Sequence, residues 1–356
     1  MSRFPARAAA MNDAQRAAHI RETVMAHGAE LRRRYPLLQH QDALGASILV
    51  FALAGMFGAA ALYLGGVLAW WACLLLNAFF AALTHELEHD LIHSMYFRKR
   101  RVPHNLMLAL VWLARPSTIN PWVRRHLHLN HHKVSGSEQD IEERAISNGE
   151  PWGLARLLMV GDNLMSSFIR FLRAKTHQQR WMIVSRTLHV YAPLGLLNWG
   201  CWYLFLGFHA VDGLAGLLGA PLAWSAGTLQ AMAVVDGAVV VLVGPNVLRT
   251  FCLHFVSSNM HYYGDLEPGN VIQQTQVLNP WWLWPLQAFC CNFGSSHAIH
   301  HFVVKEPFYI RQLTVPFAHR VMREMGVRFN DFGTFARANR WRRAERGQPA
   351  GQTQVA

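Results

Sequence analysis

Three histidine clusters are the part of this sequence that could do chemistry. The chain holds 20 histidines, and the clusters occupy residues 85–93, 126–132 and 297–301. Adjacent imidazoles such as His131-His132 and His300-His301 repel each other when protonated, so these pairs are poor structural choices unless something keeps them neutral. A metal ion does this, because it binds the unprotonated ring nitrogen. The clusters therefore predict a metal site.

The number of histidines indicates which metal is bound. Structural zinc takes four ligands and catalytic zinc three. Two six-coordinate irons offer about twelve positions, and nine imidazoles would leave roughly three for oxygen or water, as dioxygen activation requires. The nine candidate ligands are His85, His89, His128, His131, His132, His261, His297, His300 and His301. We expect His93, His126 and His254 to lie close to the metals, as supporting residues or as replacements for a ligand.

Two other metal chemistries leave part of this pattern unexplained. Soluble carboxylate-bridged diiron proteins need two Glu-x-x-His motifs, and only Glu86-x-x-His89 has that spacing here. The segment 85–89 also matches the HExxH motif of zinc metalloproteases, with Glu86 as general base. An intramembrane protease would need a third ligand such as Asp212 or Asp236, and it would leave the second and third clusters without a role. A metal transporter, the non-catalytic alternative, should instead carry its histidines along the spans.

The distribution of charge predicts which elements position the clusters. The chain is 52% hydrophobic and 15% charged, with a net charge of +12, whereas soluble domains carry about 25% charged residues. Lys and Arg are absent from residues 43–97 and 187–248, which contain the longest apolar runs, and they crowd the remaining segments. This is the positive-inside pattern of a membrane protein. It argues against nucleic acid as the partner of the basic residues.

The apolar runs predict an all-α integral membrane protein with four transmembrane helices in two hairpins. The expected spans are residues 44–64, 67–83, 188–210 and 224–243. Neither hairpin turn carries a basic residue, so both turns should face away from the cytoplasm. Both termini and a helical cap that carries the histidine clusters would then be cytosolic, at the inner or plasma membrane if the protein is bacterial.

Three regions follow from this division of the chain. Residues 1–42 are polar and Arg-rich, without a cleavable signal peptide, and the spacing of Ala17, Ile20, Val24 and Leu31 predicts a helix lying on the membrane surface. Residues 152–172 are similar. Residues 43–330 would form the catalytic unit, and residues 331–356 a basic, flexible tail.

The spacing of the clusters, HxxxH at 85–89, HxxHH at 128–132 and HxxHH at 297–301, resembles that of the membrane fatty acid desaturase/hydroxylase superfamily. The resemblance covers residues from about 44 to 305, and the isolated ninth ligand of that superfamily resembles His261 in Asn259–Gly264. It implies a diiron enzyme in the lipid bilayer that uses dioxygen to attack an unactivated C–H bond of a fatty acyl chain. No cytochrome b5 domain is fused, so a separate electron donor is expected, such as ferredoxin with its reductase.

The reaction itself stays open, because all branches of the superfamily share the clusters. A fatty acid desaturase is the first expectation. The alternatives are a fatty acid decarboxylase that makes terminal 1-alkenes from free acids, a hydroxylase, or a carotenoid ketolase.

The resemblance also suggests residues around the metals. Asp140 matches an acid common in the family. Ser257 stands where stearoyl-type desaturases carry an asparagine that holds a water at the metal, and Asn259 is close by in sequence. An anionic head group, free acid or thioester, would sit at the cytosolic rim against basic side chains. The candidates are Arg98, Lys99, Arg115, Arg124 and Arg125.

Overall fold

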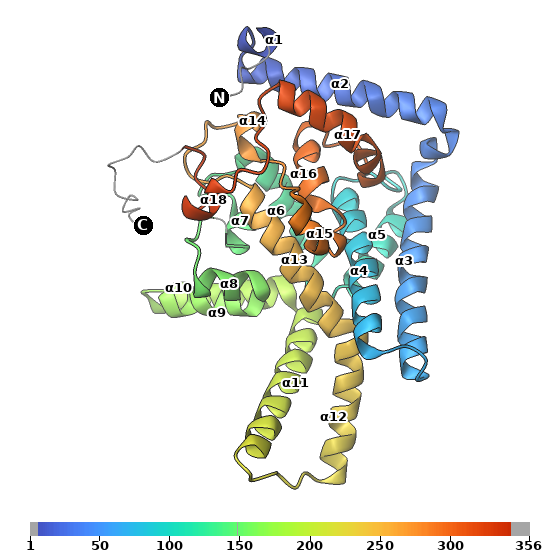
Figure 1. The fold of residues 1–356 in the computed structure, drawn as a ribbon, viewed down its shortest axis with the longest axis vertical. Coiled ribbons are helices and arrows are strands. Elements are labelled where there is room, and N and C mark those ends of the chain that lie inside the picture. Colours follow the sequence, from blue (N-terminus) through green and yellow to red (C-terminus); the bar gives the residue numbers. More distant parts are fainter. Residues whose placement is uncertain (1–5, 148, 343–356) are drawn as a thin grey trace.

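The protein is built from helices that gather above two long hairpins (Figure 1). The computed structural model describes residues 6–147 and 149–342, and these ranges contain no β-strand, only two isolated bridges. The longer elements are α2 (Asp13–Arg34), α3 (Gln41–Leu64), α4 (Trp70–Ile92), α5 (Arg101–Leu113), α6 (Pro121–Val134), α8 (Leu154–Gly161), α9 (Asn163–Arg173), α10 (His177–Tyr191), α11 (Leu194–Leu217), α12 (Ala226–Ala238), α13 (Gly244–Met260), α16 (Phe293–Phe302) and α17 (Phe308–Glu324). The short elements are α1 (Ala6–Ala9), η1 (Pro36–Gln39), α7 (Ile141–Ala145), η2 (Val239–Val243), α14 (Val271–Gln274), η3 (Trp281–Leu283), α15 (Trp284–Ala288) and α18 (Gly333–Ala336).

Four helices are long and apolar enough to cross a membrane: Gln41–Leu64, Trp70–Ile92, Leu194–Leu217 and Ala226–Met260. They pair as two hairpins, α3 with α4 and α11 with α12, whose turns lie at the same end of the molecule (Figure 1). The expected all-α membrane architecture with two hairpins is therefore confirmed. The helical cap lies at the other end of the hairpins, where α4 and α13 rise into it.

The bounds of the second hairpin differ from the expected ones. The third span begins at Leu194 instead of residue 188, because the helix is interrupted at Pro193. Residues 177–191 form the separate helix α10. Proline has no N–H to donate and disfavours helical conformation in the residue before it. The fourth span is one continuous helix from Ala226 through the π-helical segment η2 to Met260, and it therefore connects the apolar hairpin to His261.

Polar side chains join the two helices of the second hairpin. Asp236, the carboxylate inside the fourth apolar segment, lies 2.8 Å from Nε2 of His209 on α11. Trp224 donates its indole N–H to Asp212 at the turn. These pairs satisfy groups that would otherwise be costly in hydrocarbon, and both aspartates lie on the hairpin instead of the cap.

The N-terminal helix α2 covers the cap instead of lying on the membrane with its apolar face. Ile20 and Val24 are buried in one core with Ala298, Phe302 and Met322, so the face that the spacing predicted packs against α16 and α17. Asn12 and Gln15 form a capping box that begins this helix. In Figure 1, α2 crosses the cap at the end farthest from the hairpin turns. The expectation of a surface helix for residues 1–42 is corrected accordingly.

The chain beyond residue 330 also packs onto the cap as far as it is described. Asp331 accepts a hydrogen bond from the hydroxyl of Tyr262 at 2.9 Å, and the side-chain amide of Asn339 donates to the carbonyl of His261 at 3.1 Å. Residues 331–342 therefore differ from the expected flexible tail, whereas residues 343–356 lie outside the described part of the chain.

Candidate metal centre

Nine histidine side chains converge in the cap as two groups. In the first group, Nε2 of His300 lies 3.1 Å from that of His93 and 3.0 Å from that of His132, and Nε2 of His128 lies 3.0 Å from that of His93. Ligand nitrogens of His89, His93, His128 and His300 all lie within 4.8 Å of one another. Nitrogens that are each about 2.1 Å from one metal ion and at right angles are separated by about 3 Å. The first group therefore has the spacing of a coordination sphere.

The second group lies beside the first and uses other members of the same clusters. Ligand nitrogens of His131, His261 and His301 lie within 4.8 Å of one another. Nε2 of His297 is 3.2 Å from that of His261 and 3.3 Å from that of His301. The first group consists of His89, His93, His128, His132 and His300. The second group consists of His131, His261, His297 and His301.

His93 stands in the first group where the sequence led us to expect His85. The Nδ1 atom of His85 lies 3.4 Å from Nη1 of Arg115, and its Nε2 has no partner among the described residues. His85 instead borders the groups from one side, in a small cavity that it shares with His89, His128 and His297. His126 is exposed on the outer face of α6, and His254 on α13 belongs to neither group.

Carboxylates and amides hold the outward nitrogens of the histidines. Nδ1 of His128 lies 2.8 Å from Glu142, and Nδ1 of His131 lies 2.9 Å from Asp140. Nδ1 of His261 lies 2.9 Å from the backbone carbonyl of Ser257, and Glu143 approaches it at 3.2 Å. The side-chain oxygen Oε1 of Gln274 lies 3.1 Å from Nδ1 of His301. A proton fixed on Nδ1 leaves the lone pair of Nε2 free to bind a metal, which is the usual arrangement around metal-bound histidines. Asp140 was expected here, whereas Glu142, Glu143 and Gln274 were not.

The short helix α7 explains how three carboxylates reach two histidine groups. Asp140 caps α7 by accepting the N–H of Glu143 at 3.4 Å, and it also accepts the N–H of Gly136 at 3.2 Å. Gly136 has a φ of +80° and sits against Leu266 and the carbonyl of Tyr262, so a side chain there would clash. This tight turn brings Asp140, Glu142 and Glu143 back onto the face of α6 that carries the histidines.

The electrostatics of the groups keep most of the histidines neutral. Burial, together with the neighbouring histidines, lowers the pKa of His297, His300 and His301 well below the usual value. Burial also lowers the pKa of His131, but the hydrogen bond and charge of Asp140, with Glu143 and Glu142, outweigh it and raise the pKa to about 9. Neutral imidazoles with inward nitrogens are the form that binds metal.

Unpaired buried nitrogens test whether a metal fits these residues. Both ring nitrogens of His89 and Nε2 of His131 are buried without a hydrogen-bond partner in the described part of the chain. Leaving such atoms unpaired costs about 1–3 kcal/mol each, so the arrangement is favourable only with an ion to bind. An all-imidazole set with carboxylates behind it suits iron or another first-row transition metal.

The acids of the first cluster do not act as a protease would require. Arg311 of α17 donates to Asp90 at 2.9 Å and to Glu86 at 3.3 Å, and all three side chains are buried. Glu86 is therefore held in an ion pair instead of activating a water beside His85 and His89. Asp212 and Asp236, the possible third ligands, lie on the hairpin of α11 and α12. The zinc metalloprotease alternative is not supported by this geometry.

A small buried cavity of about 20 Å³ adjoins both histidine groups. Ser257, Leu253, Phe293 and Arg124 line it together with His85, His89, His128 and His297. The hydroxyl of Ser257 lies 3.4 Å from Nδ1 of His261, so Ser257 stands beside the groups as expected. Asn259 does not, because its side chain is engaged by Trp152 and Phe255. The volume suffices for about one water-sized group.

The basic residues expected at a head-group site separate into two kinds. Arg115 is buried against Glu88, and Arg124 bridges Glu88 and Glu142 at 3.1 Å from each. Arg115 therefore cannot serve the exposed rim as expected. Arg98 and Lys99 are exposed in the turn before α5, and Arg125 donates to Ser94.

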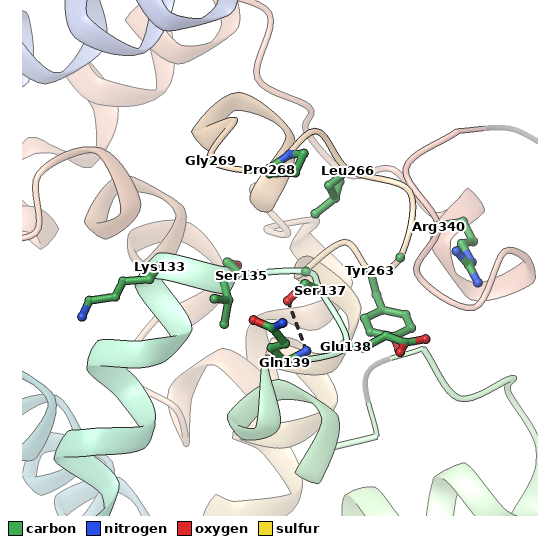
Figure 2. A pocket seen from close by; sticks show the side chains of 13 residues that line it. Lys133, Ser135, Ser137, Glu138, Gln139, Tyr263, Leu266, Pro268, Gly269 and Arg340 are labelled. Carbon is green, nitrogen blue, oxygen red and sulfur yellow. Dashed lines mark hydrogen bonds between the residues drawn. The ribbon is translucent and has the colours of Figure 1, made fainter. Parts of the chain in front are cut away.

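A cavity of about 580 Å³ opens where α6 ends (Figure 2). Figure 2 shows Lys133, Gln139, Tyr263 and Arg340 around it, with the backbone N–H of Gln139 donating to Ser137 at 3.2 Å. Lys133, Glu138 and Arg340 give this lining charged side chains, and Val134, Leu266 and Pro268 give it apolar ones.

Comparison with known protein families identifies the family of the chain. The family model described as "Fatty acid desaturase" matches residues 65–333, well over half of the chain. The matched range contains all three histidine clusters and the isolated His261. A search of the curated proteins found no match.

Proposed function

Since the chain belongs to the fatty acid desaturase family, and is therefore an oxidoreductase of the membrane, we propose that it is a diiron oxidase. It would use dioxygen to remove hydrogen from a fatty acyl chain. The observation that carries the proposal is the convergence of nine histidines as two groups at the end of four apolar helices. Asp140, Glu142, Gln274 and the carbonyl of Ser257 support it by fixing outward nitrogens.

The residues of this chain have distinct tasks in the proposed reaction. The first group would hold one iron and the second group the other, and the irons would supply the activation of dioxygen. Asp140 and Glu142 would orient the imidazoles of His131 and His128 and retain their Nδ1 protons. Arg311 locks α4 to α17 through Glu86 and Asp90, so the first and third clusters keep their relative position. Phe293 stacks on His297 at 4.1 Å between ring centroids, and it lines the small cavity.

Fatty acid desaturation is the reaction we propose first. It removes two hydrogens from adjacent carbons and reduces dioxygen to two waters with two electrons and two protons from the donor side. Decarboxylation of a free acid takes one hydrogen from the β-carbon and releases the carboxyl group as carbon dioxide, with the same two donor electrons. Hydroxylation inserts one oxygen atom and reduces the other to water.

The proposed topology places the cap and both termini in the cytoplasm, where a ferredoxin-type donor with its reductase could reach it. The basic turn 98–101 supports this orientation through the positive-inside rule, and all four of its side chains are exposed. The lipid bilayer would surround the hairpins and supply the acyl substrate.

Two measurements test the proposal. Elemental analysis of purified protein should find two irons per chain, and a single zinc without iron would refute the metal assignment. Product analysis by mass spectrometry should use reduced donor, oxygen, and free acids, acyl-CoAs and carotenoids in parallel. An internal alkene of unchanged length would establish desaturation, and a 1-alkene one carbon shorter would establish decarboxylation. Turnover of carotenoids alone would refute an acyl substrate.

A further inference from the structure

One buried arginine of the cap has no acidic partner among the residues that the structure describes. Arg249 is 1% exposed, and it lies on α13 just beyond the apolar part of the fourth span. Its side chain contacts Thr250 at 2.7 Å and Asn246 at 3.4 Å, both neutral, and its Nη1 has no partner among the described residues. A buried cation without an anion is strongly unfavourable. Arg249 therefore points to an anionic ligand.

Arg115 and Arg124 differ from Arg249 in having acidic partners. Residues that flank Arg249 contact the segment that carries Arg115: the side-chain amide of Asn246 donates to the carbonyl of Ala114 at 3.1 Å, and the hydroxyls of Thr250 and Ser117 lie 3.4 Å apart. Arg115 and Arg124 share the carboxylate of Glu88, and Arg124 also contacts Glu142. Arg115 and Arg124 thus have carboxylate partners, whereas Arg249 forms no ion pair among the residues that the structure describes.

The position of Arg249 on α13 connects it to the metal centre. Arg249, Leu253, Ser257 and His261 follow one another at intervals of four residues, so neighbours in this series lie on the same side of the helix. Leu253 and Ser257 line the small cavity beside the histidines. Arg249 precedes Leu253 by one turn, about 6 Å along the helix axis. An anion bound by Arg249 would therefore lie close to that cavity.

We propose that Arg249, with Arg115 and Arg124 beside it, forms a buried subsite for the carboxylate of a free fatty acid. A coenzyme A thioester has no charge at its carbonyl group to match Arg249. A guanidinium binds a carboxylate with two parallel hydrogen bonds. The inference rests on the proposed function and deepens it, because the carbons nearest the metals would be those next to the carboxyl group. Among the reactions above, this position favours decarboxylation.

Equilibrium binding to the purified full-length protein tests the subsite without turnover. The probes are radiolabelled hexadecanoic acid, its methyl ester and its coenzyme A thioester. The wild type should bind the acid at least about tenfold more tightly than the ester, because a hydrogen bond to a charged group is worth about 1.5–3 kcal/mol. Arg249→Gln should remove this preference, whereas Arg249→Lys should retain part of it. The double variant Arg98→Gln/Lys99→Gln should bind like the wild type.

Each contrary outcome would overturn the subsite. Equal binding of acid and ester by the wild type would do so even if Arg249→Gln failed to fold. An unchanged preference in a folded Arg249→Gln variant, or loss of the preference in the Arg98/Lys99 variant alone, would place the head group elsewhere. A protein that binds free acids in this way but contains no iron would refute the diiron oxidase and leave the subsite standing. A two-iron protein that desaturates coenzyme A thioesters at mid-chain would support the diiron oxidase and refute the subsite.

Discussion

The Nδ1 atom of His131 lies 2.9 Å from Oδ2 of Asp140, and both side chains are buried. This contact fixes which nitrogen of His131 faces the second histidine group. Asp140→Asn would remove the charge that stabilises a metal-bound imidazole, and we expect metal affinity to fall about 10–100-fold. Titration of iron content against a chelator measures this. Glu138→Gln, in the same loop but exposed, is the matched control and should keep the affinity of the wild type.

His93 should behave as a ligand and His126 should not. His93→Ala removes the nitrogen that lies 3.0–3.1 Å from those of His128 and His300, so we expect about one iron per chain to be lost and turnover to stop. His126→Ala changes an exposed side chain near the second cluster and should retain both irons. Iron analysis of the two variants decides the matter. Full iron in His93→Ala with loss in His85→Ala would assign the position to His85.

The buried pairs of Arg311 should contribute strongly to stability. Arg311→Met would leave Asp90 and Glu86 buried without their cation, which typically costs about 3–5 kcal/mol. The melting temperature in detergent should fall markedly. Arg320→Met removes an exposed arginine on the same helix and should change it little. An unchanged melting temperature in Arg311→Met would mean that the carboxylates are neutral in the folded protein.

Electron delivery should depend on salt if the basic turn binds an acidic donor. The side chains of residues 98–101 are exposed, and attraction between surface charges is screened within about 10 Å at 0.1 M salt. At limiting donor, turnover should therefore slow as salt rises, and replacing the four basic residues with glutamine should flatten this dependence. Turnover that is independent of salt in the wild type would remove the docking surface.

The sequence predicted the architecture well where a single helix carries the signal. Spacing within one helix placed His128, His131 and His132 on α6, and the apolar runs indicated all four spans. It failed where the outcome depends on packing between distant segments. The apolar face of α2 carries Ile20 and Val24, and nothing local distinguishes a face that covers α17 from one that rests on lipid.

The choice between His85 and His93 shows the same limit at the site. Both are one helical turn from His89, so helical spacing admits either. The difference comes from Arg115, which follows α5 and takes up the space next to His85. The positions of Glu142 and Glu143 near the site could be predicted in part, since they lie two and three residues beyond Asp140. Whether their side chains approach the histidines depends on the tight turn at Gly136.

The division of the histidines between the two groups has a consequence for biosynthesis. His300 belongs to the first group, and His297 and His301 belong to the second, whereas the other ligands come from residues 89–132 and 261. The ribosome makes the chain from its N-terminus, so both histidine groups remain incomplete until α16 has left the exit tunnel. Iron should therefore enter after synthesis and membrane insertion, and a nascent chain stalled before residue 297 should retain no stable diiron centre.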